Sequence, residues 1–169
     1  MKDSISKVIR DRFTKGFIAG FLWGIVISFI VLAFYLRYSL ICEYPSGKSF
    51  EATCFDLSAQ ISSAKGWSGK NSGCPLPKPA DGTQISTLDL CNAKFAEKIL
   101  TDIENRRISS ILPCKFSVYE KNNGKTYIGR LNTWLVGIII GGDAGKILNS
   151  QVAPEQEKMI RDTLKKTEE

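Results

Sequence analysis

The sequence contains no histidine among its 169 residues. That absence excludes Ser-His-Asp and Cys-His catalytic arrangements, a histidine-ligated haem and any zinc site that uses imidazole. There is no Cys-x-x-Cys pair, which excludes a thioredoxin-like centre and c-type haem attachment. The run from Gly141 to Gly145 has neither the lysine nor the spacing of a phosphate-binding loop. The common enzyme sites are therefore missing, and we expect no catalytic residue, no cofactor and no metal site.

Charge is also missing from one long stretch. Residues 16–36 hold no charged side chain, and Lys15 and Arg37 flank them. The stretch is long enough for a helix to cross the hydrocarbon core of a bilayer. A cleaved signal peptide is the alternative, but this apolar core is too long and no small-x-small cleavage site follows it. We predict an uncleaved transmembrane helix over residues 16–37.

Positive charge around this helix predicts its orientation. Residues 1–15 carry a net charge of +3, whereas the other flank has Arg37 and then no basic residue until Lys48. The positive-inside rule then places residues 1–15 in the cytoplasm and residues 38–169 outside. In a bacterium this means a single-pass protein of the inner membrane with a periplasmic domain.

Small residues recur every four positions in the apolar stretch, at Gly16, Gly20, Gly24 and Ser28. Such spacing lets two helices approach closely in lipid, although glycine is common in membrane helices in any case. We interpret the four residues as a helix-packing face, for a second copy of this chain or for other integral membrane subunits.

The net charge of +6 does not indicate a nucleic-acid partner. Residues 1–15 and Arg37 supply most of the excess, and the outer domain has a net charge of only +2, without a cluster of basic residues. We therefore expect the lipid bilayer and other proteins as partners, and no nucleic acid.

The outer domain alternates between strand-like and helix-like patterns. The predicted strands are 38–44, 84–90, 111–120 and 125–131, the last two joined by the Asn122-Asn123-Gly124 turn. Helices are predicted over 49–64 after Ser49, over 93–105 after Asn92 and over about 154–166 after Pro154. Residues 66–82, rich in glycine and proline, are expected to be a loop. This order predicts an α+β fold, one antiparallel sheet with helices on one face.

Several motifs carry a family resemblance. They are Leu90-Cys91-Asn92, Glu104-Asn105-Arg106, Leu112-Pro113-Cys114, Val118-Tyr119-Glu120-Lys121, Gly124-Lys125-Thr126-Tyr127-Ile128, Leu131-Asn132 and Gly141-Gly142. Together with the helix that begins at Ser49, they resemble the domain-of-unknown-function family 302 over residues 38–165. The resemblance implies a small α+β domain, often dimeric, and no established activity. Two departures are the apolar segment after Asn132 and the loop around Cys74.

Five cysteines remain, at positions 42, 54, 74, 91 and 114, and an oxidising compartment would permit disulfides. Cys91 with Cys114 is one predicted pair. Cys91 ends a predicted strand and Cys114 begins the next one, and these two ends can lie together when a helix connects the strands antiparallel. Cys54 with Cys74 is the second predicted pair. Small buried hydrophobes are the alternative for Cys42 and Cys54. Another alternative makes Cys91 or Cys114 a reactive thiol, because a helix N-terminus favours a thiolate.

A second apolar run follows Asn132 and is too short to span a bilayer. It contains Trp134, Leu135, Val136, Ile138, Ile139 and Ile140. The run is either a core element under the last helix or a surface that docks on the membrane or on a partner subunit.

Three functions remain open. The first is a non-catalytic accessory subunit of a larger membrane complex, such as a respiratory or electron-transfer complex. The second is a thiol-dependent redox or sulfur-relay protein that uses Cys91 and Cys114. The third, based on fold analogy, is a small-ligand-binding or sensor domain.

Overall fold

The chain divides into two compact units, residues 1–39 and 40–169. A computed structural model describes residues 2–71, 79–112 and 114–165, and the side chains of these residues from position 16 onward. The first unit is one helix, α1 (Lys2–Ser39). Its segment Gly16–Ser39 is long and apolar enough to cross a membrane. The apolar side chains of this segment are exposed, as a lipid-facing helix requires.

The second unit is built on a five-stranded antiparallel sheet with the strand order β1-β5-β4-β3-β2. The strands are β1 (Ile41–Ser46), β2 (Trp67–Asn71), β3 (Ile85–Asn92), β4 (Cys114–Glu120) and β5 (Thr126–Leu131). The β4–β5 hairpin turns at Gly124, whose φ is +70°. The predicted α+β class and antiparallel sheet are confirmed.

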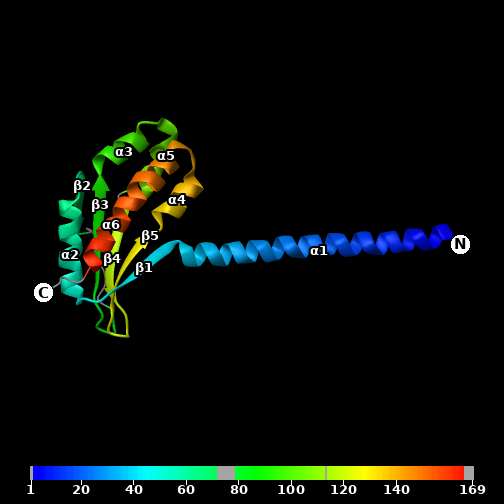
Figure 1. Cartoon of the computed structure of the whole chain (residues 1–169), viewed down its shortest axis with the longest axis horizontal. Helices are drawn as coiled ribbons and strands as arrows, with labels where there is room; N and C mark the ends of the chain where they lie inside the picture. The colour runs from blue at the N-terminus through cyan, green and yellow to red at the C-terminus, as the bar shows by residue number, and fades with distance from the viewer. Residues whose placement is uncertain (1, 72–78, 113, 166–169) are drawn as a thin grey trace. The chain divides into compact units, whose positions relative to one another are not determined.

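Helices cover one face of the sheet (Figure 1). They are α2 (Phe50–Ser63), α3 (Ala93–Leu100), α4 (Thr133–Ile140), α5 (Gly142–Ile147) and α6 (Ala153–Leu164). A 3₁₀ segment, η1 (Ile103–Ile111), follows α3, and a π-helical turn, η2 (Leu148–Val152), joins α5 to α6. Ser49 and Asn92 cap α2 and α3 as expected.

The core lies between this helical layer and the alternate residues of the strands that point toward it. Leu88 and Leu90 of β3, Phe116 and Val118 of β4 and Ile128 of β5 are buried there. The opposite sheet face carries Thr87, Asp89 and Cys91 on β3 and Lys115 and Ser117 on β4. Because side chains alternate along a strand, residues two positions apart lie on the same face of the sheet.

Four segments differ from the sequence-based expectation. The first strand runs from Ile41 to Ser46 rather than over residues 38–44, because α1 continues to Ser39. Residues 67–71 form the edge strand β2 rather than a loop, and Gly69 permits it, because a Cβ there would lie 2.7 Å from Ile61 Cγ2. The second helix ends at Leu100 rather than near residue 105, because Asp102 caps the separate η1 segment. The fourth strand begins at Cys114 rather than at residue 111, which η1 still occupies.

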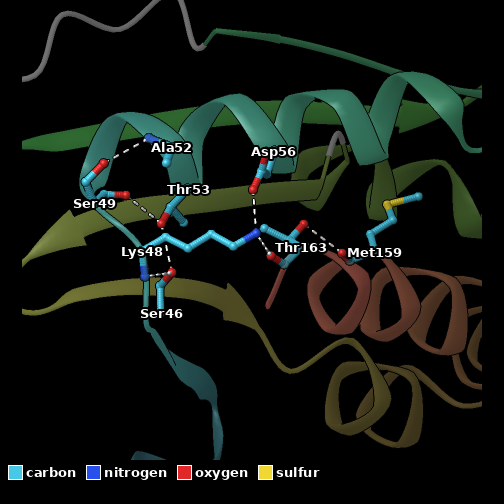
Figure 2. Close-up of polar contacts among 8 residues, drawn as sticks. All are labelled: Ser46, Lys48, Ser49, Ala52, Thr53, Asp56, Met159 and Thr163. Atoms are coloured by element: carbon cyan, nitrogen blue, oxygen red, sulfur yellow. Dashed lines mark hydrogen bonds and ion pairs between the residues drawn. The ribbon is translucent and has the colours of Figure 1, made fainter. Parts of the chain in front are cut away.

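Lys48 joins three elements of the second unit (Figure 2). Its Nζ donates to Asp56 Oδ2 in α2 at 2.5 Å and to the carbonyl oxygen of Thr163 near the end of α6 at 2.9 Å. Its backbone N–H donates to the Ser46 hydroxyl oxygen of β1. A cation at the C-terminal end of a helix stabilises the last carbonyl groups. Lys48 therefore links the segment between β1 and α2 to the end of α6.

Replacing Lys48 with methionine is expected to lower the free energy of unfolding by about 1.5–3 kcal/mol, because hydrogen bonds to charged groups contribute that much. The Lys48 side chain is only 20% exposed, so water cannot fully replace these contacts. The matched control is Lys146→Met, which removes an exposed ion pair with Asp143. In a urea titration of both variants, Lys146→Met should leave the unfolding midpoint close to that of the wild type. Equal losses in the two variants would contradict the assigned role.

Candidate functional site

Strands β4 and β5 part at one end of the sheet. Their paired residues stop at Phe116 opposite Arg130. Beyond that point Cys114 stays opposite Leu90 of β3, while Leu131 stays opposite Ile41 of β1. The two halves of the sheet thus separate, and the space between them is left without ladder hydrogen bonds.

A cavity of about 490 Å³ occupies this opening. Its apolar lining is Ile41, Ile111, Leu112, Leu131, Val136 and Leu148. Its polar lining includes Thr87, Ser110, Cys114, Lys115, Ser117, Arg130, Thr133 and Gln156. The volume falls within the range of small-molecule sites, which are mostly apolar with a few polar groups.

Arg130 is the buried charge of this cavity, with a side chain that is 8% exposed. Its Nη2 donates to Glu157 Oε2 at 2.6 Å and to the Tyr44 hydroxyl oxygen at 3.0 Å. Its Nη1 donates to the carbonyl oxygen of Leu131. Its Nε, also buried, has no hydrogen-bond partner among the described residues. An unpaired buried donor is costly, so this atom requires an explanation.

The ion pair between Arg130 and Glu157 changes the titration of its neighbours. Burial raises the pKa of Glu157, but hydrogen bonds from Tyr44 and Arg130, together with the guanidinium charge, outweigh burial and bring that pKa below its usual 4.5. Burial and the hydrogen bond to Glu157 raise the pKa of Tyr44 to about 12. At neutral pH the pair is therefore ionised, its charges balance, and the Tyr44 hydroxyl keeps its proton.

Thr133, Gln156 and Cys114 form a second polar group in the same wall. The Thr133 hydroxyl donates to Gln156 Oε1 at 2.6 Å, and both side chains are buried. Burial raises the pKa of the Cys114 thiol, although a hydrogen bond from Gln156 and its own backbone oppose that shift. The thiol therefore stays protonated near neutral pH, which is unfavourable for a nucleophile.

The two predicted disulfide pairs have different outcomes. Cys42, Cys54, Cys91 and Cys114 are all free thiols. Cys114 lies opposite Leu90 and Cys91 is the next residue of β3, yet both side chains line one small cavity beside that strand end. The predicted Cys91–Cys114 disulfide is not supported, because the structure contains both residues as free thiols. Cys74, the proposed partner of Cys54, lies outside the described residues. Burial raises the pKa of the Cys54 thiol.

The apolar run after Asn132 is helix α4, and it divides between the two expected roles. Leu135 is buried, and Val136 and Ile140 pack against the core. Trp134, Ile138 and Ile139 are exposed. The helix is therefore partly core and partly an apolar surface, and its N-cap segment is tied to the start of the domain by the hydrogen bond from Asn132 N–H to the Leu40 carbonyl oxygen.

The small-residue spacing in α1 shapes a groove. Gly24 and Ser28 line it, together with Phe21, Ile25, Phe29 and Leu32. The Ser28 hydroxyl donates to the Gly24 carbonyl oxygen at 2.8 Å, so its polar group is satisfied within the helix. A Cβ on Gly16, Gly20 or Gly24 would meet no atom within 4 Å, and the spacing therefore leaves open space.

Sequence reasoning singled out Cys114 and Val136, for other roles, but missed the remaining residues around the cavity. One signal was present: the alternation of β5 places Arg130 on the same face as the buried Ile128. A charged residue in a core-facing position is uncommon unless it is paired. Its partners Tyr44 and Glu157 could not be identified, because they lie 86 and 27 positions away. Within the described ranges, no three cysteine or acidic side chains lie together as metal ligands.

Comparison with known proteins confirms the resemblance. A crystal structure of an uncharacterized conserved protein DUF302 from Bacillus stearothermophilus superposes with a TM-score of 0.57. Its sequence is 19% identical, and the likeness covers 73% of this chain and 98% of that one. At this identity the likeness shows the fold alone. No curated protein matches the sequence.

The family model named Domain of unknown function DUF302 matches residues 80–166. This range includes Cys114, Arg130, Gln156 and Glu157 but neither Ile41 nor Tyr44, which precede it. The match covers just over half of the 169 residues. The chain therefore belongs to the DUF302 family, whose function is unknown.

Proposed function

We propose that the second unit is a small-ligand-binding domain that α1 holds at a membrane. One observation carries this proposal: a 490 Å³ cavity whose wall contains a buried arginine with an unpartnered Nε–H. Because Nε is buried in the unliganded wall, a ligand oxygen reaches it only when adjacent side chains shift, and it then removes the penalty of an unpaired buried donor. The charge of the guanidinium is balanced by Glu157 whether or not a ligand is bound.

The proposal includes a location. The excess of basic residues in positions 1–15 supports a cytoplasmic N-terminus, and the domain then lies on the periplasmic side of a bacterial inner membrane. A cysteine-accessibility experiment on intact cells checks this: a cysteine introduced at exposed Ser110 should add reaction with a membrane-impermeant maleimide from outside, above the background that the native free thiols give in the wild type. Reaction only after the inner membrane is permeabilised would invert the orientation.

The binding test compares two isoleucines on the same side of the sheet. Ile41 is 55% exposed and lines the cavity, whereas Ile85 is 43% exposed and does not. We expect Ile41→Trp to narrow the cavity and Ile85→Trp to leave it open, with little effect on folding. Small molecules retained by the full chain through purification are then released by denaturation and compared by mass spectrometry.

A molecule present with the wild type and with Ile85→Trp, but lost with Ile41→Trp, is the expected result. Added back, it should raise the unfolding temperature of the wild type by several degrees, because saturating ligand stabilises by about 2–4 kcal/mol. If all three proteins retain the same molecules, or none, the proposed function is wrong.

A second candidate function, the accessory subunit of a membrane complex, is favoured by the exposed apolar residues of α4. Trp134, Ile138 and Ile139 lie in the domain, and the groove at Gly24 and Ser28 lies in α1. The variant Trp134→Ser/Ile138→Ser/Ile139→Ser should lose any integral membrane protein that co-purifies with the wild type in mild detergent. Purification of the wild type as a lone monomer would count against this function. The thiol-relay alternative is less favoured, because burial raises the pKa of the Cys114 thiol, even though Cys91 and Cys114 line the same small cavity.

A further inference from the structure

We infer that the ligand of the cavity is an amphiphile with an oxygen-acceptor head group, bound head-first against Arg130, and with an apolar chain that extends toward the cavity mouth. This inference rests on the proposed ligand-binding function and specifies the ligand class. It follows from the charge of the lining, from the hydrogen-bond donors that remain available, and from the depth at which each lining residue lies.

The charge of the lining selects the head group. Two cations, Lys115 and Arg130, line the cavity, and among the described residues no Asp or Glu does. Lys115 also pairs with Asp89 at 3.0 Å, and Arg130 with Glu157 at 2.6 Å. A cationic head would therefore find no carboxylate among these lining residues, because Asp89 and Glu157 lie outside the lining. A carboxylate, ester or carbonyl oxygen would meet hydrogen-bond donors.

The hydrogen bonds made by the lining residues also favour an acceptor head group. The Thr133 hydroxyl donates to Gln156, and both Nη atoms of Arg130 donate within the protein. The Nε of Arg130 is the buried donor that these contacts leave unused. A ligand acceptor that displaces the side chains around this buried atom completes the guanidinium, whose planar donors match oxygen acceptors well.

The depth of the lining residues sets the direction of the ligand. The polar side chains of Arg130, Thr133 and Gln156 are buried, and so is Leu148 below them in the helical layer. Ile41 and Ile111 are 55% and 41% exposed and therefore stand at the mouth. The head group thus goes to the inner end, and the apolar chain contacts the isoleucines.

The mouth also lies near the point where the chain leaves α1. Ile41 is two residues beyond Ser39, the last residue of that helix. If α1 spans a bilayer, this covalent link keeps Ile41 close to the membrane surface. An amphiphile can then come either from the bilayer or, as a free acid, from water, and the two sources share the same chemistry.

Photo-crosslinking of the full chain in phosphatidylcholine nanodiscs tests the inference. The probe is decanoate with a diazirine at the end of its chain, and labelled peptides are mapped by mass spectrometry. We expect labelling of peptides that contain Ile41 or Ile111. Ile41→Trp should lower this labelling roughly tenfold, the effect of about 1.4 kcal/mol in binding. Ile85→Trp should leave it unchanged, and labelling of α1 by probe dissolved in the lipid serves as the internal reference.

Two further comparisons test the head group. A decyltrimethylammonium ion with the same diazirine has no acceptor and should label α1 but not the cavity peptides. Arg130→Lys keeps a cation beside Glu157 but removes Nε, and should lower decanoate labelling roughly tenfold if its melting temperature shows that it folds. Equal labelling of the cavity by the ammonium probe, or equal labelling of Ile41→Trp and Ile85→Trp by decanoate, would overturn the inference.

The probes also separate the two sources and the two proposals. Cavity labelling by a phosphatidylcholine that carries the diazirine chain identifies a bilayer lipid as the source, whereas labelling by free decanoate alone identifies an acid from water. Both results support an amphiphile. If decanoate does not label the cavity and the co-purifying molecule has no apolar chain, the ligand class is wrong but ligand binding stands. If no molecule is retained either, both proposals are wrong.

Discussion

Replacing Gly145 with alanine is expected to destabilise the domain by about 3 kcal/mol or more. A Cβ at Gly145 would lie 2.2 Å from the carbonyl oxygen of Gly137, so α4 and α5 would have to move apart. Extra atoms in a tightly packed region typically cost about 1–3 kcal/mol, and the cost is higher here because both contacting groups are backbone. Separation of these helices would also shift Thr133 and Val136, which line the cavity.

The measurement is urea unfolding of the full chain followed by circular dichroism. Gly47→Ala is the matched control, since a Cβ at Gly47 meets no atom within 4 Å and its backbone is not left-handed. That change should shift the unfolding free energy by no more than about 0.5 kcal/mol. Gly137→Ala should also destabilise, because its Cβ would lie 2.9 Å from the backbone carbonyl oxygen of Gly145 as well as overlap the Asn149 side chain. A Gly145→Ala variant as stable as Gly47→Ala would show that the two helices do not touch at these glycines.

Removing Glu157 is expected to cost more than removing Arg130, although the two residues form one ion pair. Glu157→Leu leaves a guanidinium that is 8% exposed without its carboxylate, and we expect a loss of roughly 2–3 kcal/mol. Arg130→Met leaves a carboxylate that is 39% exposed and that water can solvate, and we expect a loss at least about 1 kcal/mol smaller. The asymmetry follows from which charge is left buried.

The double variant Arg130→Met/Glu157→Leu sharpens this expectation. It removes both charges, so it should be more stable than Glu157→Leu alone, as is common when a buried pair is replaced by apolar residues. Urea unfolding of the four proteins forms a double-mutant cycle. A double variant less stable than Glu157→Leu would contradict the view that the unpaired guanidinium is the dominant cost.

The same pair predicts a pH dependence. The folded-state pKa of Glu157 lies below its usual 4.5, so its stabilising contribution is complete above about pH 4.5 and is lost as pH falls through the folded value. The stability gap between the wild type and Glu157→Leu should therefore narrow in acid. A gap that stays constant from pH 7 into that acidic range would mean that the carboxylate contributes little.

The sequence predicted the layout of the domain because that layout is encoded locally. Alternation in residues 84–90, caps at Ser49 and Asn92 and the Asn122-Asn123-Gly124 turn are short-range signals, and each marks an element that the structure contains. Strand β2 was missed because glycine normally weakens a strand. Here Gly69 is required by the close approach of Ile61, and that contact is invisible in a local pattern.

The site was not predictable in the same way. Tyr44, Arg130 and Glu157 come from β1, β5 and α6, and the cavity exists because β4 and β5 each remain paired with their outer neighbours. Neither fact follows from the residues of one segment. By contrast, the two cysteines that drew attention do lie near each other, since both line a small cavity at the end of β3, but no disulfide joins them.

The pairing of β1 with β5 has a consequence for synthesis. Ile41 pairs with Leu131, so β1 can pair with β5 only after the ribosome has made the residues up to 90 positions further along the chain. At ordinary elongation rates this delay lasts roughly 5–20 s. During that time β1 has an unpaired edge, and the domain cannot close by local contacts alone. The first strand to emerge is thus among the last to fold, and β5 completes the sheet only after most of the domain is already present.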